Sequence, residues 1–92
     1  MFPLAPGVSY VDLNFRHTPG VIATGVLIDA AGVVIVDPGP TSCLETLTRT
    51  LAAEGVAIAD VRFLLLTHIH LDHAGATGTL VQQNPNIDVY VH

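Results

Sequence analysis

The chain has 92 residues, of which 50% are hydrophobic and only 12% are charged, and its net charge is −5. A chain of this length forms one small domain at most, and its three basic residues, all arginines, are too few for a surface that binds nucleic acid or anionic membrane. No apolar run is long enough to cross a bilayer, and the start has two prolines and no basic segment, so we expect neither a membrane span nor a signal peptide.

The first half of the sequence predicts three strands. Residues 8–15 alternate imperfectly between apolar and polar, and residues 21–27 are rich in β-branched side chains. Residues 33–36 are apolar throughout, which predicts a central strand covered on both faces. Turns at Pro19-Gly20 and at residues 29–32 separate the three strands, so we expect an antiparallel meander.

A helix is predicted from residue 43 to residue 54. Ser42 and Glu45 have the spacing of a capping box, with Ser42 as the N-cap. Gly55 is a natural stop at the C-terminal end. The apolar stripe of this helix consists of leucines at helical spacing: Leu44, Leu47 and Leu51.

The second half alternates strand and helix. After a connection over residues 56–60, we expect a strand over 61–67 that is apolar on both faces, a helix over 74–83 and a final strand over 89–91. Helical crossovers of this kind join parallel strands. The predicted fold class is therefore α/β (α+β), with one mixed sheet.

The run from residue 68 to residue 73 follows the predicted strand directly and carries three imidazoles and one carboxylate, side chains that bind zinc and similar divalent ions. His68 and His70 are two residues apart at a strand end, so both rings can project to the same side. Asp72 and His73 are adjacent and point differently, so this pair can reach a second position close by. Burying several imidazoles without partners is costly, and the run therefore predicts a metal site.

Asp37 follows the predicted central strand, at the same kind of edge as the metal-ligand run. Two interpretations are open: the carboxylate orients a metal ligand, or it accepts backbone hydrogen bonds within its own turn. Cys43 is the only cysteine, so no internal disulfide forms, and we expect it to pack as a small apolar residue. A single free cysteine fits a reducing compartment and predicts a cytoplasmic location. His17 and His92 are expected to be ordinary surface groups, with the alternative that His92, at a strand end, faces the same cleft as the metal-ligand run.

The segment Thr67 to Gly75, with sequence THIHLDHAG, resembles the HxHxDH signature of the metallo-β-lactamase superfamily, and Val36 to Gly39 resembles the aspartate motif that precedes it in that family. The resemblance covers nearly the whole chain and is greatest for the glyoxalase-II-like metallohydrolases. It implies half of an αββα sandwich, with one mixed sheet and helices on one face. It also implies that residues 1–92 are the N-terminal part of a single domain whose C-terminal half is absent.

The same resemblance assigns roles to the site residues. His68 and His70 would bind a first zinc ion and Asp72 and His73 a second, with manganese or iron as alternative metals. Asp37 would support the ligand loop. Metal-activated water would then hydrolyse an ester, thioester or lactone bond of a small molecule, with Asp72 as the catalytic residue that steers the proton. Family members that reduce oxygen at di-iron sites have glutamate at the position of His70, so histidine here favours hydrolysis.

The remaining metal ligands of the family come from the second half of its fold. We therefore expect the 92 residues to be incomplete or inactive as an enzyme when they are isolated. The low share of charged residues agrees with an apolar sheet face that another part of the protein covers. The alternative is a non-catalytic, metal-binding half-domain that self-associates through this exposed sheet.

Overall fold

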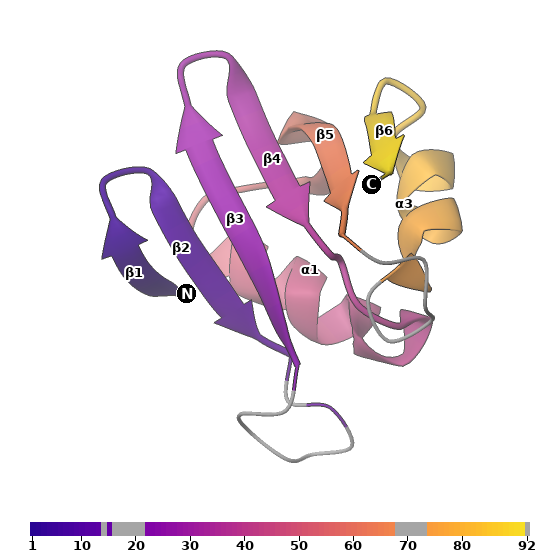
Figure 1. Ribbon diagram of the computed structural model, residues 1–92, viewed down its shortest axis with the longest axis horizontal. Coiled ribbons are helices and arrows are strands. Elements are labelled where there is room, and N and C mark those ends of the chain that lie inside the picture. The colour runs from indigo at the N-terminus through magenta and orange to yellow at the C-terminus, as the bar shows by residue number, and fades with distance from the viewer. Residues whose placement is uncertain (14, 16–21, 68–73, 92) are drawn as a thin grey trace.

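The computed structural model describes residues 1–13, 15, 22–67 and 74–91. These residues form a six-stranded sheet whose strands lie in chain order from β1 to β6. The strands are β1 (Phe2–Ala5), β2 (Val8–Asp12), β3 (Ala23–Asp29), β4 (Gly32–Val36), β5 (Val61–Leu66) and β6 (Asp88–Val91). The helices are α1 (Leu44–Ala53) and α3 (Thr77–Gln83), with short 3-10 turns η2 (Thr41–Cys43) and η3 (Ile58–Asp60) (Figure 1).

The sheet is mixed, as the sequence predicts. Strands β1 to β4 pair antiparallel with their neighbours, which confirms the predicted meander. Strands β4, β5 and β6 pair parallel, and α1 and α3 lie in the two connections between them. The predicted fold class, one mixed sheet with helices on one face, is therefore confirmed.

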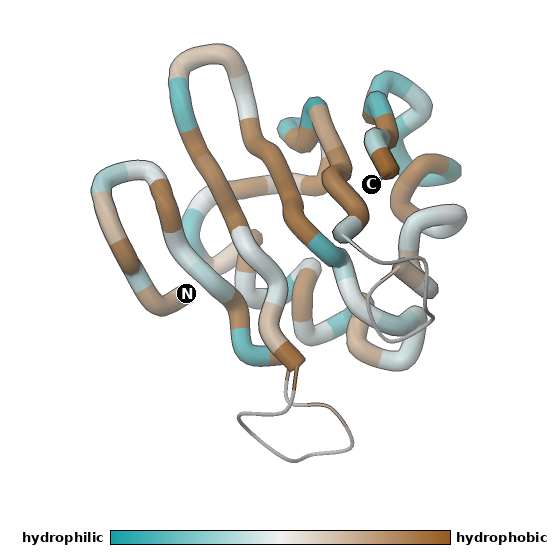
Figure 2. The backbone as a smooth tube through the Cα atoms, in the orientation of Figure 1, coloured by the Kyte–Doolittle hydropathy of each residue, from teal (hydrophilic) through white to brown (hydrophobic). Residues whose placement is uncertain are grey.

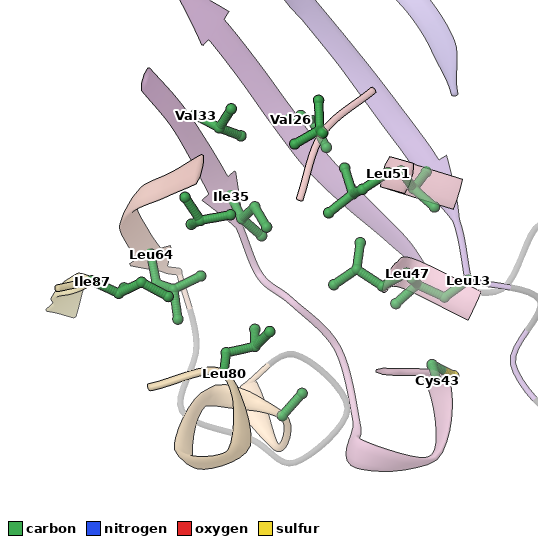
Figure 3. Packing of buried hydrophobic residues seen from close by; sticks show 14 residues of the cluster. Leu13, Val26, Val33, Ile35, Cys43, Leu47, Leu51, Leu64, Leu80 and Ile87 are labelled. Carbon is green, nitrogen blue, oxygen red and sulfur yellow. The ribbon is translucent and has the colours of Figure 1, made fainter. Parts of the chain in front are cut away.

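One face of the sheet packs against the helices. The leucine stripe of α1 behaves as predicted, since Leu47 and Leu51 are fully buried and Leu44 is partly buried against them. Leu80 of α3 joins the same cluster, and Figure 3 shows it on the side of the sheet that α1 covers. Burying each such side chain stabilises the fold by about 1.5–3 kcal/mol. The strands contribute these buried residues: Val11, Val26, Val33, Ile35, Val61 and Leu64.

The opposite face of the sheet is apolar, and no helix among the described residues covers it. We call it the open sheet face; the register places these side chains on it: Phe2, Tyr10, Leu27, Val34, Val36, Phe63, Leu65 and Tyr90. Leu65 is 37% exposed and Tyr90 is 56% exposed. Aromatic pairs lie near both edges, with ring centroids 5.0 Å apart for Phe2 and Tyr10 and 5.9 Å apart for Phe63 and Tyr90.

Strand β4 is predicted to be central and covered on both faces. Within the part of the chain that the structure describes, helices cover one of these faces, and the other belongs to the open sheet face. Figure 2 shows hydrophobic residues concentrated along β3, β4 and β5. The continuous apolar runs arise because one set of side chains packs on the helices and the other set lies on the open sheet face.

The start of α1 differs from the prediction. The N–H of Cys43 donates to the carbonyl of Pro40 over 3.0 Å, so residues Thr41–Cys43 form a 3-10 turn and α1 begins at Leu44. Cys43 is then the N-cap, with no side-chain cap hydrogen bond, and the predicted capping box at Ser42 is wrong. The end is as predicted: Gly55 has a φ of 77° and donates its N–H to the carbonyl of Ala52. Cys43 is buried in the core, which confirms its apolar role.

Some boundaries differ as well. β3 runs to Asp29, two residues beyond the expected end, and α3 begins at Thr77 rather than at residue 74. Asn84, which ends α3, is buried, and its side-chain amide donates to the carbonyls of Ile58 and Val61 at 2.9 Å each. This amide ties the end of α3 to the beginning of β5. Within the described ranges, no helix is long and apolar enough to cross a membrane.

Candidate metal centre

The candidate site lies where the parallel strands β4 and β5 end. Asp37 directly follows β4, and Thr67 directly follows β5. The carboxyl edge of parallel strands is the place where α/β proteins bind ligands. The four predicted metal ligands come immediately after Thr67 and lie outside the described residues, so their convergence on one point stays a prediction: His68, His70, Asp72 and His73. His17 and His92 also lie outside this range.

Asp37 is held in an unusual backbone conformation, with a φ of 55°. A left-handed conformation costs a non-glycine residue about 1–2 kcal/mol. Two hydrogen bonds to its main chain offset this cost. The N–H of Asp37 donates to the carbonyl of Leu65 over 3.0 Å, and the carbonyl of Asp37 accepts the hydroxyl of Thr24 at 2.8 Å. Thr24 lies on β3 and is fully buried, so this contact is partly shielded from water.

The carboxylate of Asp37 binds the end of the neighbouring strand. One oxygen accepts the backbone N–H of Thr67 at 2.9 Å, and the other accepts the hydroxyl of the same residue. These hydrogen bonds come from outside the turn of Asp37, from the residue immediately before His68. The carboxylate thus holds the backbone at the start of the run.

The far end of the run is held by the same loop. The carbonyl of Gly39 accepts the N–H of Ala76 at 2.9 Å, and the hydroxyl of Thr41 donates to the carbonyl of Gly75 over 3.0 Å. Residues 37–41 therefore contact both flanks of residues 68–73. The sequence did not identify Thr24 or Thr41 as site residues. For Thr24 the one signal was a polar residue near the start of a largely apolar strand, and for Thr41 there was none.

A shallow hollow lies beside this edge. It has a volume of about 310 Å³ and is lined by Leu65, Leu66, Thr67, Tyr90 and Val91. Its walls are largely apolar, and Thr67 connects it to the candidate ligand run. An apolar group bound there would lie next to the residues that precede His68.

The donor set fits a divalent metal such as zinc. Imidazole nitrogens and a carboxylate are ordinary zinc ligands, and four of them follow Thr67 within six positions. The described residues contain no group of three or more His, Cys, Asp or Glu side chains close enough to hold a metal ion.

The chain thus has one mixed sheet with helices on one face, and a His/Asp run of the kind that binds metal ions follows β5 in the sequence. Comparison with known proteins identifies the family. The sequence model of the metallo-beta-lactamase superfamily matches residues 17–92, and the chain belongs to this superfamily.

Two curated relatives are named as a thioesterase and as a hydrolase. The chain is 31% identical over 87 residues to "Thioesterase pkgB" of Emericella nidulans, a match that covers 95% of this chain and 23% of the relative. It is 39% identical over 56 residues to "Hydroxyacylglutathione hydrolase" of Pseudoalteromonas translucida, which covers 61% of this chain and 20% of the relative.

Solved structures show the same fold. A motif mutant of the metallo-beta-lactamase from Cronobacter sakazakii matches with a TM-score of 0.81 and 28% identity, over 96% of this chain and 32% of that chain. FEZ-1 metallo-beta-lactamase from Legionella gormanii also matches with a TM-score of 0.81 over 96% of this chain and 31% of that chain; at 19% identity it shows the fold alone. The chain thus spans about a third of these structures and about a fifth of the curated relatives.

Proposed function

We propose that the protein carrying this chain is a metal-dependent hydrolase whose centre includes His68, His70, Asp72 and His73. The observation that carries the proposal is the pair of hydrogen bonds between the Asp37 carboxylate and Thr67, the residue that leads into this run. Membership of the metallo-beta-lactamase superfamily supports the same class of reaction.

One or two bound zinc ions would lower the pKa of a bound water to about 7, so that it can act as a nucleophile near neutral pH. The residues of this chain would contribute in two ways. The imidazoles and the Asp72 carboxylate would hold the ions, and Asp72 would also steer the proton of the attacking water. Asp37 fixes the backbone that leads into His68.

The substrate is proposed to be a small molecule with an ester, thioester or lactone bond, and a thioester is favoured. Two relatives support this choice, since one is named a thioesterase and another a hydroxyacylglutathione hydrolase.

Metal analysis tests the proposal directly. We expect the purified protein that carries this chain to contain one or two equivalents of zinc by atomic emission, and thioester hydrolysis to stop when a chelator removes the metal. Added Zn²⁺ should restore the activity. A protein that hydrolyses thioesters at an unchanged rate after its metal has been removed would contradict the proposal.

We further propose that residues 1–92 are the N-terminal part of a single domain, and that the remaining part packs on the open sheet face. Partly exposed apolar residues there support this arrangement, since soluble monomers rarely leave large contiguous apolar patches in water. The same face supports the alternative function, a non-catalytic metal-binding half-domain in which a second copy covers the sheet.

Sedimentation of the isolated 92-residue polypeptide separates the two arrangements. We expect a broad, concentration-dependent distribution, because the open sheet face has no specific partner. Leu65→Lys, which places a charge on that face, should shift the distribution toward the monomer. Arg49→Lys, at an exposed side chain of α1, serves as the control. A discrete and tight dimer that Leu65→Lys dissociates would favour the half-domain alternative.

A further inference from the structure

The loop over residues 37–41 contacts the chain on both sides of the candidate ligand run. At the near side, Asp37 accepts two hydrogen bonds from Thr67. At the far side, the Thr41 hydroxyl donates to the carbonyl of Gly75 over 3.0 Å, and the Gly39 carbonyl accepts the N–H of Ala76 at 2.9 Å. Thr41 and Gly75 are 34 residues apart in the sequence, so the contact is tertiary.

We propose that Thr41 is a positioning residue for the metal centre, which fixes the far end of residues 68–73 while Asp37 fixes the near end. The inference rests on the proposed function, because it concerns the same ligands. Thr41 does not touch the metal or the substrate in this scheme. It acts through the backbone that follows His73.

The loop is suited to this role because it is anchored on both sides. The main chain of Asp37 is held by Leu65 and by the buried Thr24. Pro38 and Gly39 are buried. After Pro40, the 3-10 turn η2 leads to Cys43, which lies in the hydrophobic core. A hydrogen bond from such a loop therefore holds its partner at a defined position.

The far flank is also only partly fixed by packing. Ala76 is fully buried in the core cluster, whereas Gly75 is half-buried and has no side chain to pack. The Thr41 hydroxyl therefore holds the residue between the core and the ligand run. When both flanks of residues 68–73 are held in place, the run has less conformational entropy to lose on binding a metal ion. Metal binding is therefore more favourable.

A rival interpretation is that Thr41 only stabilises the entry into α1, since it is the first residue of η2. The two roles predict different results. If Thr41 positions the centre, removal of its hydroxyl weakens metal binding more than it weakens the fold, because Thr41 is exposed and water can replace the lost partner of Gly75. If Thr41 serves the helix, the fold loses stability and the metal affinity of the folded protein is unchanged.

The test is a Co²⁺ titration of the protein that carries this chain, followed by the visible absorption of bound Co²⁺. We expect Thr41→Val to weaken Co²⁺ binding by about tenfold, the lower end of the effect of residues that orient metal ligands, and to alter the absorption bands. Thr41→Ser keeps the hydroxyl and should bind within about twofold of the wild type. Thr48→Val, a change of the same size within α1, should bind as the wild type does.

Several outcomes would overturn the inference. Wild-type affinity and spectrum in Thr41→Val would show that the hydroxyl has no role in the centre, and failure of Thr41→Ser to restore binding would show the same. A Thr41→Val protein that does not fold, judged by circular dichroism, would assign Thr41 to folding. If the wild type binds no Co²⁺, the proposed function fails together with this inference. If the wild type binds Co²⁺ and Thr41→Val binds it with the same affinity, only this inference fails.

Discussion

Replacing His68 by alanine is expected to lower kcat/KM for thioester hydrolysis by about a thousandfold or more, in the protein that carries this chain. A loss of this size corresponds to about 4 kcal/mol of transition-state stabilisation. His68 follows Thr67, the residue that the Asp37 carboxylate holds at the sheet edge.

The reason for the large effect is that a catalytic metal needs all of its ligands. Catalytic zinc sites usually have three protein ligands and one water, so loss of one imidazole leaves the ion weakly bound and its water less acidic. Steady-state kinetics on a thioester, with the metal content measured in parallel, checks the prediction. His17→Ala is the matched control, because His17 is expected to be a surface group, and it should keep full activity. Wild-type turnover in His68→Ala would show that the site is assigned wrongly.

The sheet was largely predictable because its signals are local. Apolar runs separated by turn residues define β3, β4 and β5, and the helical spacing of leucines defines α1. β1 was not predicted, because Pro3 lies within it and prolines argue against a strand from sequence alone. As an edge strand it tolerates the missing N–H. The start of α1 was predicted wrongly, since Ser42 and Glu45 have capping-box spacing whether or not a 3-10 turn precedes the helix.

The site was predictable only in part, because its supports come from distant parts of the chain. The position of Asp37 followed from the order of the elements, since it comes directly after a central strand. The hydrogen bond from Thr24 spans 13 residues and the one from Thr41 spans 34, and a single threonine in a sequence does not indicate its partner. The four metal ligands remain predicted from residue type and spacing, and the variants of His68 and Asp37 test them.

Replacing Asp37 has a second large expected effect, and a set of three variants resolves its origin. Asp37→Ala removes the acceptors of both Thr67 hydrogen bonds and leaves a non-glycine residue at a φ of 55°. We expect it to destabilise the metal-free protein by about 2 kcal/mol, from the lost hydrogen bonds and the less favourable backbone. We also expect it to weaken Co²⁺ binding by about 10- to 100-fold, as loss of a residue that orients ligands does.

Asp37→Gly and Asp37→Asn separate the contributions. Glycine accepts the left-handed backbone without strain but has no carboxylate, so it should recover part of the unfolding free energy in urea and none of the Co²⁺ affinity. Asparagine can still accept the N–H of Thr67 with its oxygen and donate its amide to the Thr67 hydroxyl. If Asp37 acts through Thr67, Asp37→Asn should therefore bind Co²⁺ much more tightly than Asp37→Ala. Equal losses in Asp37→Asn and Asp37→Ala would instead mean that the negative charge acts on the metal itself, and wild-type affinity in Asp37→Gly would mean that the carboxylate does not support the ligand run.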